Sequence, residues 1–368
     1  MATEHALEVW REDVRGGYPD PRLLGLPGRE RLETWGIGRT PAPPLTRLTG
    51  AKITEVGSGT AGADMPASGW LLNSAGAIGG GTLAIVADIA FGCSIQTELG
   101  PGIPYTTAEL SMTFLRPAKL GCTLSAGGQA IHVGRSVALS EAFVIEEGSE
   151  RLIAHGTSRC AVLPPIEPLP EPPGDLPPVP PDGNEDSDPY RRPWPTDKVV
   201  PQQTWDRLSG KEIIARQQKG ELPPPPIHDL TGIRLDEFGD GTATMRLPAT
   251  EWLTSPARMV QGGVIAMLAD MTMLIAVETT APAGTAFAGL DLKVNYLRPV
   301  SPDGRDLTAR AAVVHAGRTI VITRAEIDNA EGKPVALATG SAMYLPGRPA
   351  SLGEVELAVE AEEPDEPQ

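Results

Sequence analysis

The length and charge of the chain exclude several classes of protein. Its 368 residues exceed one ordinary compact domain and suit two, and its net charge of −16 argues against a broad surface for nucleic acid or an anionic membrane. Hydrophobic residues make up 40% and aromatic residues only 4%, so we expect cores built from Ala, Val, Ile and Leu. Three cysteines without CxxC spacing exclude a disulfide scaffold and a structural zinc site.

The N-terminal residues and the hydropathy pattern indicate a cytoplasmic protein. The first residues include acids and contain no apolar run, so we expect no signal peptide. No apolar stretch reaches the length of a membrane span without Asp, Glu or many Gly. The unpaired cysteines also suit a reducing compartment. The sequence therefore predicts a cytoplasmic location, with neither a membrane nor a nucleic acid as partner.

The predicted elements of the first half are strands around one long helix. In chain order they are a helix at 30–35, strands near 51–57 and 60–67, a long apolar helix over 80–99, and strands at 107–117, 122–133, 136–147 and 151–163. The strand TAELSMTFLRP is the clearest, because its alternation places Leu110, Met112 and Phe114 on one face. One long helix with these strands indicates an α+β fold in which the helix lies on an antiparallel sheet.

The second half repeats the first at a constant offset. PPLTRLTGAKITEVGSGTA at 43–61 aligns with PPIHDLTGIRLDEFGDGTA at 225–243, and the offset of 182 residues continues without a gap to LRP at 115–117 and 297–299. After one inserted residue, HxGR at 132–135 falls on HxGR at 315–318. Composition alone does not produce such a match, so the two halves are predicted to share one fold, the second with its long helix over 262–279.

The repeat divides the chain into five predicted segments. They are an N-terminal segment at 1–42, the first repeat at 43–163, a proline-rich linker at 164–203, a helical lead-in with the second repeat at 204–346, and an acidic tail at 347–368. Dense proline favours extended polyproline II structure, so we interpret the linker as an exposed tether. The alternative is a proline-rich ligand for a partner module, for example through 177–181.

Each long helix carries one carboxylate in an otherwise apolar sequence. GGTLAIVADIAFGCSIQ contains Asp88, and GGVIAMLADMTMLIAV contains Asp270. A helix that is apolar all round is buried, and a buried carboxylate is costly unless it has a partner or a task. We interpret both as catalytic groups in a cleft between the halves. The alternative is a structural Asp that caps a neighbouring loop or pairs with an arginine such as Arg116.

Glycines at the helix starts supply the second part of the predicted site. Their free backbone amides lie at the positive end of the helix dipole, where they can hold a carbonyl oxygen as charge builds on it. Eight residues separate Gly80 from Asp88. This is about 12 Å along the axis, so one helix cannot place both groups on one reacting carbon. Two antiparallel helices can, and we predict two composite sites, with Asp88 facing Gly262 and Asp270 facing Gly80.

The combined motifs resemble a known family. GGG-x6-AD and QGG-x6-AD, followed by FLRP and YLRP and by the HxGR hairpin, are similar to the hotdog-fold acyl-CoA thioesterases, in particular the phenylacetyl-CoA thioesterase-like group. The resemblance covers about 45–163 and 228–346. It implies a double hotdog, in which each repeat wraps a curved antiparallel sheet around its helix. It also implies hydrolysis of an acyl-CoA or another acyl thioester. We expect no cofactor, and no His, Cys or Asp cluster has the spacing of a metal site.

The resemblance carries the family's catalytic groups over to particular residues. Its nucleophile or general base falls on Asp88 and Asp270, and its oxyanion donor on Gly80 and Gly262. We also expect Gly81 and Gly263 to contact the substrate. Whether the carboxylate attacks directly or activates a water molecule stays open.

Each half departs from the family pattern. The family's His before the glycines is replaced by Gly79 in one half and by Gln261 in the other, and its upstream Asn matches Asn73 but is Ser255 in the second half. Its strand hydroxyl matches Thr107 but is Gly289 in the second half. One site therefore keeps more of the family's polar groups than the other. The fuller site contains Asp88, Thr107, Gln261 and Gly262, and the other contains Asp270, Gly80 and Asn73. An ordinary strand role is the alternative for Thr107.

Coenzyme A carries phosphates, so an acidic protein needs local cations to bind it. The candidates are arginines after the motif strands and in the hairpins: Arg116, Arg298, Arg135 and Arg318. The alternative is that these arginines are solvated or paired with carboxylates. The alternative function is a non-catalytic acyl-CoA-binding or scaffold protein, which the loss of the family His in both halves favours. An exposed sheet edge would favour a homo-oligomer of such chains.

Overall fold

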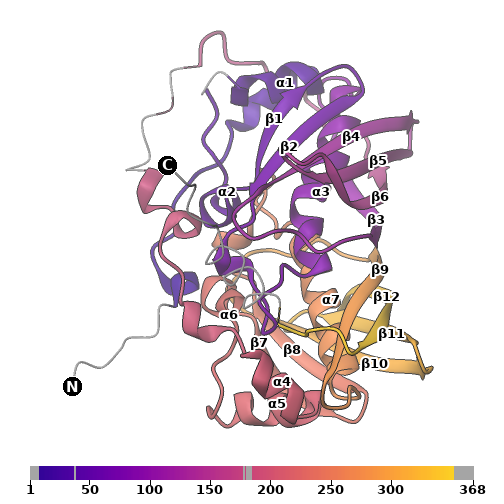
Figure 1. The fold of residues 1–368 in the computed structure, drawn as a ribbon. Helices are drawn as coiled ribbons and strands as arrows, with labels where there is room; N and C mark the ends of the chain where they lie inside the picture. Colours follow the sequence, from indigo (N-terminus) through magenta and orange to yellow (C-terminus); the bar gives the residue numbers. More distant parts are fainter. Residues whose placement is uncertain (1–7, 37–38, 177–178, 180–184, 352–368) are drawn as a thin grey trace, which may run out of the picture.

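The computed structural model describes residues 8–36, 39–176, 179 and 185–351. It shows two long helices packed on one antiparallel sheet, the α+β double hotdog expected from the sequence (Figure 1). The helices are α1 (Gly28–Gly36), α2 (Pro44–Thr49), α3 (Gly80–Thr97), α4 (Gln202–Arg207), α5 (Gly210–Gln218), α6 (Pro226–Thr231) and α7 (Gly262–Glu278). The first-half strands are β1 (Lys52–Val56), β2 (Thr60–Pro66), β3 (Tyr105–Phe114), β4 (Thr123–Val133), β5 (Val137–Glu146) and β6 (Arg151–Val162). The second-half strands are β7 (Arg234–Gly239), β8 (Thr242–Pro248), β9 (Thr285–Tyr296), β10 (Asp306–Ala316), β11 (Ile320–Asp328) and β12 (Pro334–Pro346).

The sheet is continuous across the two repeats. Its order is β1-β2-β4-β5-β6-β3-β9-β12-β11-β10-β8-β7, so the second repeat mirrors the first. The repeats join where β3 pairs with β9, with Glu109 opposite Asn295 and Thr113 opposite Asp291. The strands predicted from alternation and the two long helices are confirmed, with shifts of one or two residues at most ends.

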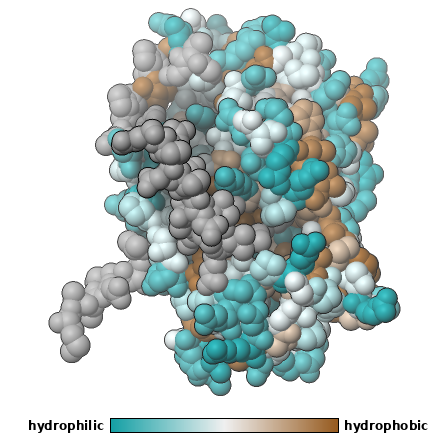
Figure 2. Space-filling view, viewed as in Figure 1, coloured by the Kyte–Doolittle hydropathy of each residue, from teal (hydrophilic) through white to brown (hydrophobic). Residues whose placement is uncertain are grey.

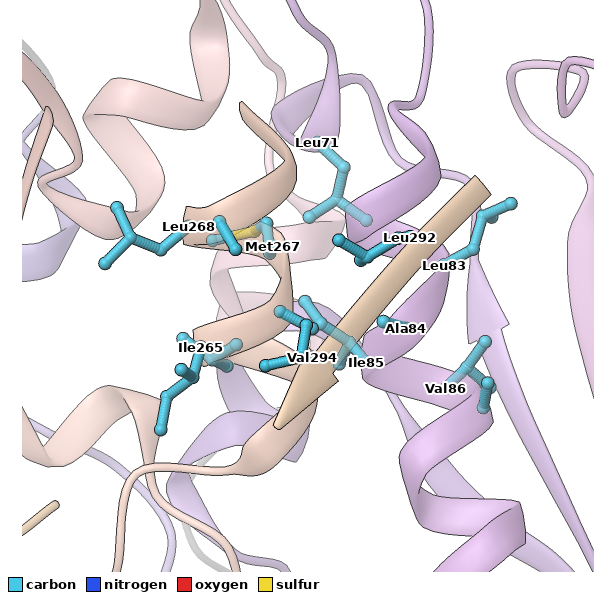
Figure 3. Close-up of a cluster of buried hydrophobic side chains, with 14 of the residues drawn as sticks. Leu71, Leu83, Ala84, Ile85, Val86, Ile265, Met267, Leu268, Leu292 and Val294 are labelled. Carbon is cyan, nitrogen blue, oxygen red and sulfur yellow. The ribbon is translucent and has the colours of Figure 1, made fainter. Parts of the chain in front are cut away.

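The central helices form the core because no side of either helix is polar. Sixteen residues of α3 are buried, and aliphatic side chains of both helices meet the inner face of β9. Figure 3 shows Ile85, Met267, Leu292 and Val294 gathered between α3, α7 and β9. By length and composition α3 could cross a membrane, but 89% of it is buried inside this fold. In Figure 2 hydrophilic residues cover much of the visible surface.

The repeated unit begins earlier than residue 43. The Gly28 amide at the start of α1 donates to the Leu99 carbonyl at 2.9 Å, and the Gly210 amide at the start of α5 donates to the Ala281 carbonyl at 3.1 Å. These two contacts are related by the same offset of 182 residues. Each short helix therefore closes the C-terminal end of the central helix of its own half.

The expectation of an exposed tether over 164–203 is wrong for its second part. Asp188 is 2% exposed and forms ion pairs with Arg15 and Arg47 at 2.7 and 3.2 Å. Val200 is fully buried, and Trp194 packs against the main core. The density of proline predicts an extended backbone. The aromatic and aliphatic side chains of the segment nevertheless pack against the folded repeats, so this part of the segment is not an exposed tether. Four of the five residues at 177–181 and the tail from 352 onward lie outside the described residues.

Short segments before each repeat are exchanged between the halves. The Trp70 indole donates to the Arg192 carbonyl at 2.9 Å, whereas the Trp252 indole donates to the Glu12 carbonyl at 3.1 Å. The residues around Arg192, which precede the second repeat, therefore cover the first repeat, and the residues around Glu12 cover the second. This exchange fixes the orientation of the two halves beyond their shared sheet.

Candidate active site

Glycines let the two central helices approach each other closely. A Cβ atom on Gly263 would lie 2.4 Å from the Ala84 carbonyl oxygen, and one on Gly81 would lie 2.9 Å from the Met267 Cα. Both contacts are with backbone atoms of the opposite helix, so only glycine fits. These contacts show that α3 and α7 run in opposite directions. The start of each helix therefore lies beside the middle of the other.

Asp88 lies opposite the start of α7. Its Oδ2 accepts a hydrogen bond from the Gly263 amide at 3.0 Å, and its Oδ1 accepts one from the Thr107 hydroxyl at 3.2 Å. The side chain is 8% exposed. The structure thus brings together Asp88, Thr107 and the glycine turn of the other repeat.

Asp270 has a related environment with one hydrogen-bond donor fewer. Its Oδ2 accepts a hydrogen bond from the Gly81 amide at 2.8 Å, and the residue is 2% exposed. The position of the strand hydroxyl is occupied by Gly289, where a Cβ atom would stand 3.8 Å from the Asp270 Oδ1. No hydroxyl group donates to Asp270 in the described part of the chain.

Burial dominates the electrostatics of both carboxylates. Loss of water raises the pKa of Asp88 to about 6, against the opposing effects of the Gly263 amide and the Thr107 hydroxyl. Loss of water also raises the pKa of Asp270 to about 6, opposed by the Gly81 amide and reinforced by the charge of Asp291. Both groups are therefore mainly ionised at neutral pH, yet they are stronger bases than an exposed aspartate.

The first glycine of each helix has an amide that the fold does not use. Within the described ranges, the amides of Gly80 and Gly262 donate to no protein acceptor. A Cβ atom on Gly262 would lie 3.1 Å from the Asp88 Oδ2, whereas one on Gly80 would lie 2.4 Å from the Phe114 ring. The free Gly262 amide therefore adjoins a carboxylate, while an aromatic ring covers Gly80. Gly81 and Gly263, expected at the substrate, use their amides to hold the carboxylates.

Two predicted site residues are engaged elsewhere. Gln261 donates its side-chain amide to the Ile85 carbonyl at 3.1 Å, and its Oε1 is buried with no hydrogen-bond partner among the described residues. Asn73 accepts from the Ala75 and Ala77 amides at 3.0 Å and so closes the loop before α3. Asn73 makes no hydrogen bond to Asp270. A local turn was an available interpretation of Asn73, because Asn side chains commonly bond backbone groups two residues on.

The four candidate arginines are all exposed. Arg116 donates to the Leu152 carbonyl at 2.8 Å, and Arg298 donates to the Pro334 carbonyl. Arg298 lies just after β9, and its backbone amide also donates to the Val335 carbonyl of β12 at 3.3 Å. Arg135 and Arg318 lie in the turns after β4 and β10. None of the four bonds Asp88 or Asp270 in the part of the chain that the structure describes.

One contact of this region was not foreseen. The Tyr296 hydroxyl donates to the Gly262 carbonyl at 2.8 Å and so fixes the first turn of α7 to β9. The corresponding residue of the first repeat is Phe114, which has no such hydroxyl. The alignment of YLRP with FLRP contained this signal, because it places a hydroxyl group at only one of the two sites.

Both carboxylates lie in a closed part of the fold. One surface hollow of about 400 Å³ lies around Ser58 and His132, another of about 160 Å³ lies around Arg305, and neither is lined by Asp88 or Asp270. The two aspartates are only 8% and 2% exposed, so little of either residue is open to solvent.

The two helix starts differ in how they are covered. The loop before α3 is held at Ser74, whose carbonyl accepts from the Val200 amide at 2.8 Å and whose hydroxyl accepts from Gln217 at 3.0 Å. In the loop before α7, residues 257–259 are exposed. The approach to Asp88 past the start of α7 is therefore the less obstructed of the two.

Comparisons with known proteins find one family in both repeats. The sequence model of the thioesterase superfamily matches residues 75–153 and 259–336, one match in each repeat. A candidate esterase of Pseudomonas aeruginosa is 31% identical over 150 residues, which are 39% of this chain and 97% of that protein. The chain belongs to the thioesterase superfamily. A candidate esterase of Haemophilus influenzae is 31% identical over 102 residues, 28% of this chain and 72% of that protein.

A solved structure supports the arrangement of this thioesterase-superfamily chain in two repeats. The tesB protein of Mycobacterium avium subspecies paratuberculosis aligns with a TM-score of 0.52 over 82% of this chain and 98% of its own. The identity is 13%, so the likeness concerns the fold alone.

Proposed function

We propose that this chain hydrolyses an acyl thioester, and that Asp88 is the catalytic carboxylate. One observation carries the proposal: a buried carboxylate, held by the Thr107 hydroxyl and the Gly263 amide, adjoins the free Gly262 amide of the opposite repeat. The amide would receive the carbonyl oxygen of the thioester as negative charge develops on it, and the positive end of α7 would add to this stabilisation.

In the proposed reaction Asp88 acts as a general base. It takes a proton from a water molecule whose oxygen attacks the thioester carbon, and the resulting oxyanion is held by the Gly262 amide. The carbon–sulfur bond then breaks, and the thiolate recovers the proton from Asp88 to leave as a thiol, with the free acid as the other product. Thr107 would orient the carboxylate, and Tyr296 would keep the first turn of α7 in place. Direct attack by Asp88 is the alternative.

We further propose that the thiol is coenzyme A. Arg298 supports this part of the proposal, because it is exposed and follows β9, whose Tyr296 contacts the first turn of α7, so that its guanidinium would meet a phosphate there. Three other statements also stay predictions: the phenylacetyl-CoA thioesterase-like group, the cytoplasmic location and a homo-oligomer of such chains. The two end strands of the sheet are β1 and β7.

A second candidate is a protein that binds acyl-CoA without hydrolysing it. The closure of the fold over both carboxylates favours this alternative, since Asp88 and Asp270 are only 8% and 2% exposed. The two functions make different demands on Asp88. Hydrolysis requires its basicity, whereas binding alone does not.

Release of free thiol from a panel of acyl-CoAs tests the proposal. Asp88→Asn keeps the size of the side chain and removes the base, so the rate should fall at least about a hundredfold, as for other general bases. Asp270→Asn is the matched control, because it makes the same change at the equivalent buried position. Equal activity of wild type and Asp88→Asn would refute the assignment. Binding of acyl-CoAs by the wild type without any thiol release would establish the binding function instead.

A further inference from the structure

A polar cluster adjoins Asp88 on the side toward the C-terminal end of α3. Asp88, Gly92 and Gln96 follow one another at intervals of four residues and so share one face of the helix. A Cβ atom on Gly92 would lie 3.0 Å from the Tyr105 hydroxyl, which donates to the Gln96 Oε1 at 3.4 Å. The cluster thus extends about 12 Å along the helix axis from the carboxylate.

Arg31 of α1 adds a positive charge to this cluster. Its Nη1 is buried without a hydrogen-bond partner, and the residue forms no ion pair with any part of the chain that the structure describes. The groups that respond to its charge are Tyr105 and Cys93, which are neutral at pH 7. Loss of water lowers the pKa of Arg31. The residue as a whole is half-buried, but a buried guanidinium nitrogen without an acceptor is costly, so Nη1 calls for an acceptor, and a carboxylate is the strongest one.

The fold itself does not require this cation. The offset of 182 residues places Ile213 at the position of Arg31, and Ile213 is fully buried in α5. Around Ile213 the other members of the cluster are replaced as well: Tyr105 by Phe287, Gly92 by Leu274 and Gln96 by Glu278. Yet α1 and α5 contact their central helices through the same glycine–carbonyl hydrogen bond. An aliphatic residue therefore satisfies the same packing, and the polar cluster belongs only to the Asp88 site.

This inference rests on the proposed thioester hydrolysis and names its substrate class. We propose that the Arg31 guanidinium binds a carboxylate at the far end of the acyl chain, so that the substrates are thioesters of dicarboxylic acids. The thioester carbon would lie at Asp88, and the chain would pass Gly92, where no side chain projects from α3. Tyr105 would turn aside to admit it. The terminal carboxylate would give Nη1 its missing acceptor in a charge-assisted hydrogen bond.

Paired substrates of equal length test the proposal. The rate constants kcat/KM are measured for dicarboxylyl-CoAs from succinyl to suberyl and for neutral acyl-CoAs of the same chain lengths. The wild type should favour at least one dicarboxylyl thioester by roughly ten- to hundredfold, the range of a hydrogen bond to a charged group. Arg31→Met retains much of the apolar stem and removes the charge, so it should lose that preference and leave neutral substrates within about twofold. Arg31→Lys should retain part of the preference.

The outcomes separate this inference from the proposed function. If hydrolysis depends on Asp88 but no dicarboxylyl thioester is preferred, the inference is overturned and the function stands. An equal loss on both substrate types in Arg31→Met, together with a lower unfolding temperature, would show a structural role and overturn it too. If the wild type hydrolyses no thioester, the proposed function fails, and the anion site is tested with adipate alone. A rise in the unfolding temperature of the wild type with adipate, absent in Arg31→Met, would support an anion site at Arg31. No such rise in the wild type would overturn the anion site.

Discussion

Glu278 is a buried carboxyl group that the proposed chemistry does not use. It lies in the last turn of α7, is 4% exposed, and its Oε1 has no hydrogen-bond partner among the described residues. Burial raises the pKa of Glu278 to about 8. The negative end of the helix dipole also disfavours a negative charge there. The equivalent residue in the first repeat is Gln96, so a neutral amide is compatible with this environment. We therefore predict that Glu278→Gln stabilises the protein at alkaline pH.

The sign and the size of the effect follow from the raised pKa. The unfolded chain loses this proton near pH 4.5, and the folded protein loses it only near pH 8. The contribution of Glu278 to stability is therefore fully present below pH 4.5 and is lost as the pH rises toward and through about 8. The interval of roughly 3.5 pH units, at about 1.4 kcal/mol each, sets an upper limit of about 5 kcal/mol.

Urea unfolding at pH 5, 7 and 9 measures this effect. The wild type should lose stability relative to Glu278→Gln at each step upward in pH, with the largest difference at pH 9. Glu237→Gln serves as the control, because Glu237 is an exposed glutamate of the same repeat. If the free energy of unfolding changed with pH in the same way for wild type and Glu278→Gln, the reasoning would be refuted. That result would mean that the Glu278 carboxyl group has the same pKa in the folded and the unfolded protein.

Two further changes test the geometry of the helix pair. Gly263→Ala should destabilise the fold by about 1–3 kcal/mol in urea unfolding, because the new Cβ would meet the Ala84 carbonyl oxygen at 2.4 Å. Gly174→Ala is its control, since nothing lies within 4 Å of that position, and an equal effect of both changes would contradict the close approach. Gly289→Thr should give Asp270 the hydroxyl it lacks and raise the thiol release that remains in Asp88→Asn. No gain in that background would show that the missing hydroxyl is not what limits the second site.

The fold was predictable because its signals are local and duplicated. The constant offset assigns one fold to both halves, and the apolar sequence around Asp88 and Asp270 requires two buried helices. These two facts predict that each carboxylate faces the glycine turn of the opposite repeat. In the structure each carboxylate lies within hydrogen-bond distance of that turn. The amides that bond the carboxylates belong to Gly81 and Gly263, which the sequence assigned to the substrate, and the role of Gly80 and Gly262 as oxyanion donors stays a prediction. Helical periodicity does not determine which amide of a first turn points at a given neighbour.

Other features depend on contacts that the sequence does not encode locally. The segment over 185–203 has the proline content of an exposed tether, but Trp194 and Val200 find apolar surface on the folded repeats. Arg31 looks like an ordinary surface residue of an amphipathic helix. That its Nη1 lacks an acceptor becomes visible only when every neighbouring oxygen is placed. Long-range complementarity, not local propensity, decides both cases.

The divergence of the repeats bears on why both carboxylates are present. Around Asp88 the chain has Thr107 and Gly92, and around Asp270 it has Gly289 and Leu274. Asp270 still accepts the Gly81 amide, which would otherwise be a buried and unpaired donor at the start of α3. That hydrogen bond is sufficient reason for an acid at this position, whether or not it takes part in hydrolysis. The presence of Asp270 is therefore no argument for a second active site, and stability should depend on it more than turnover does.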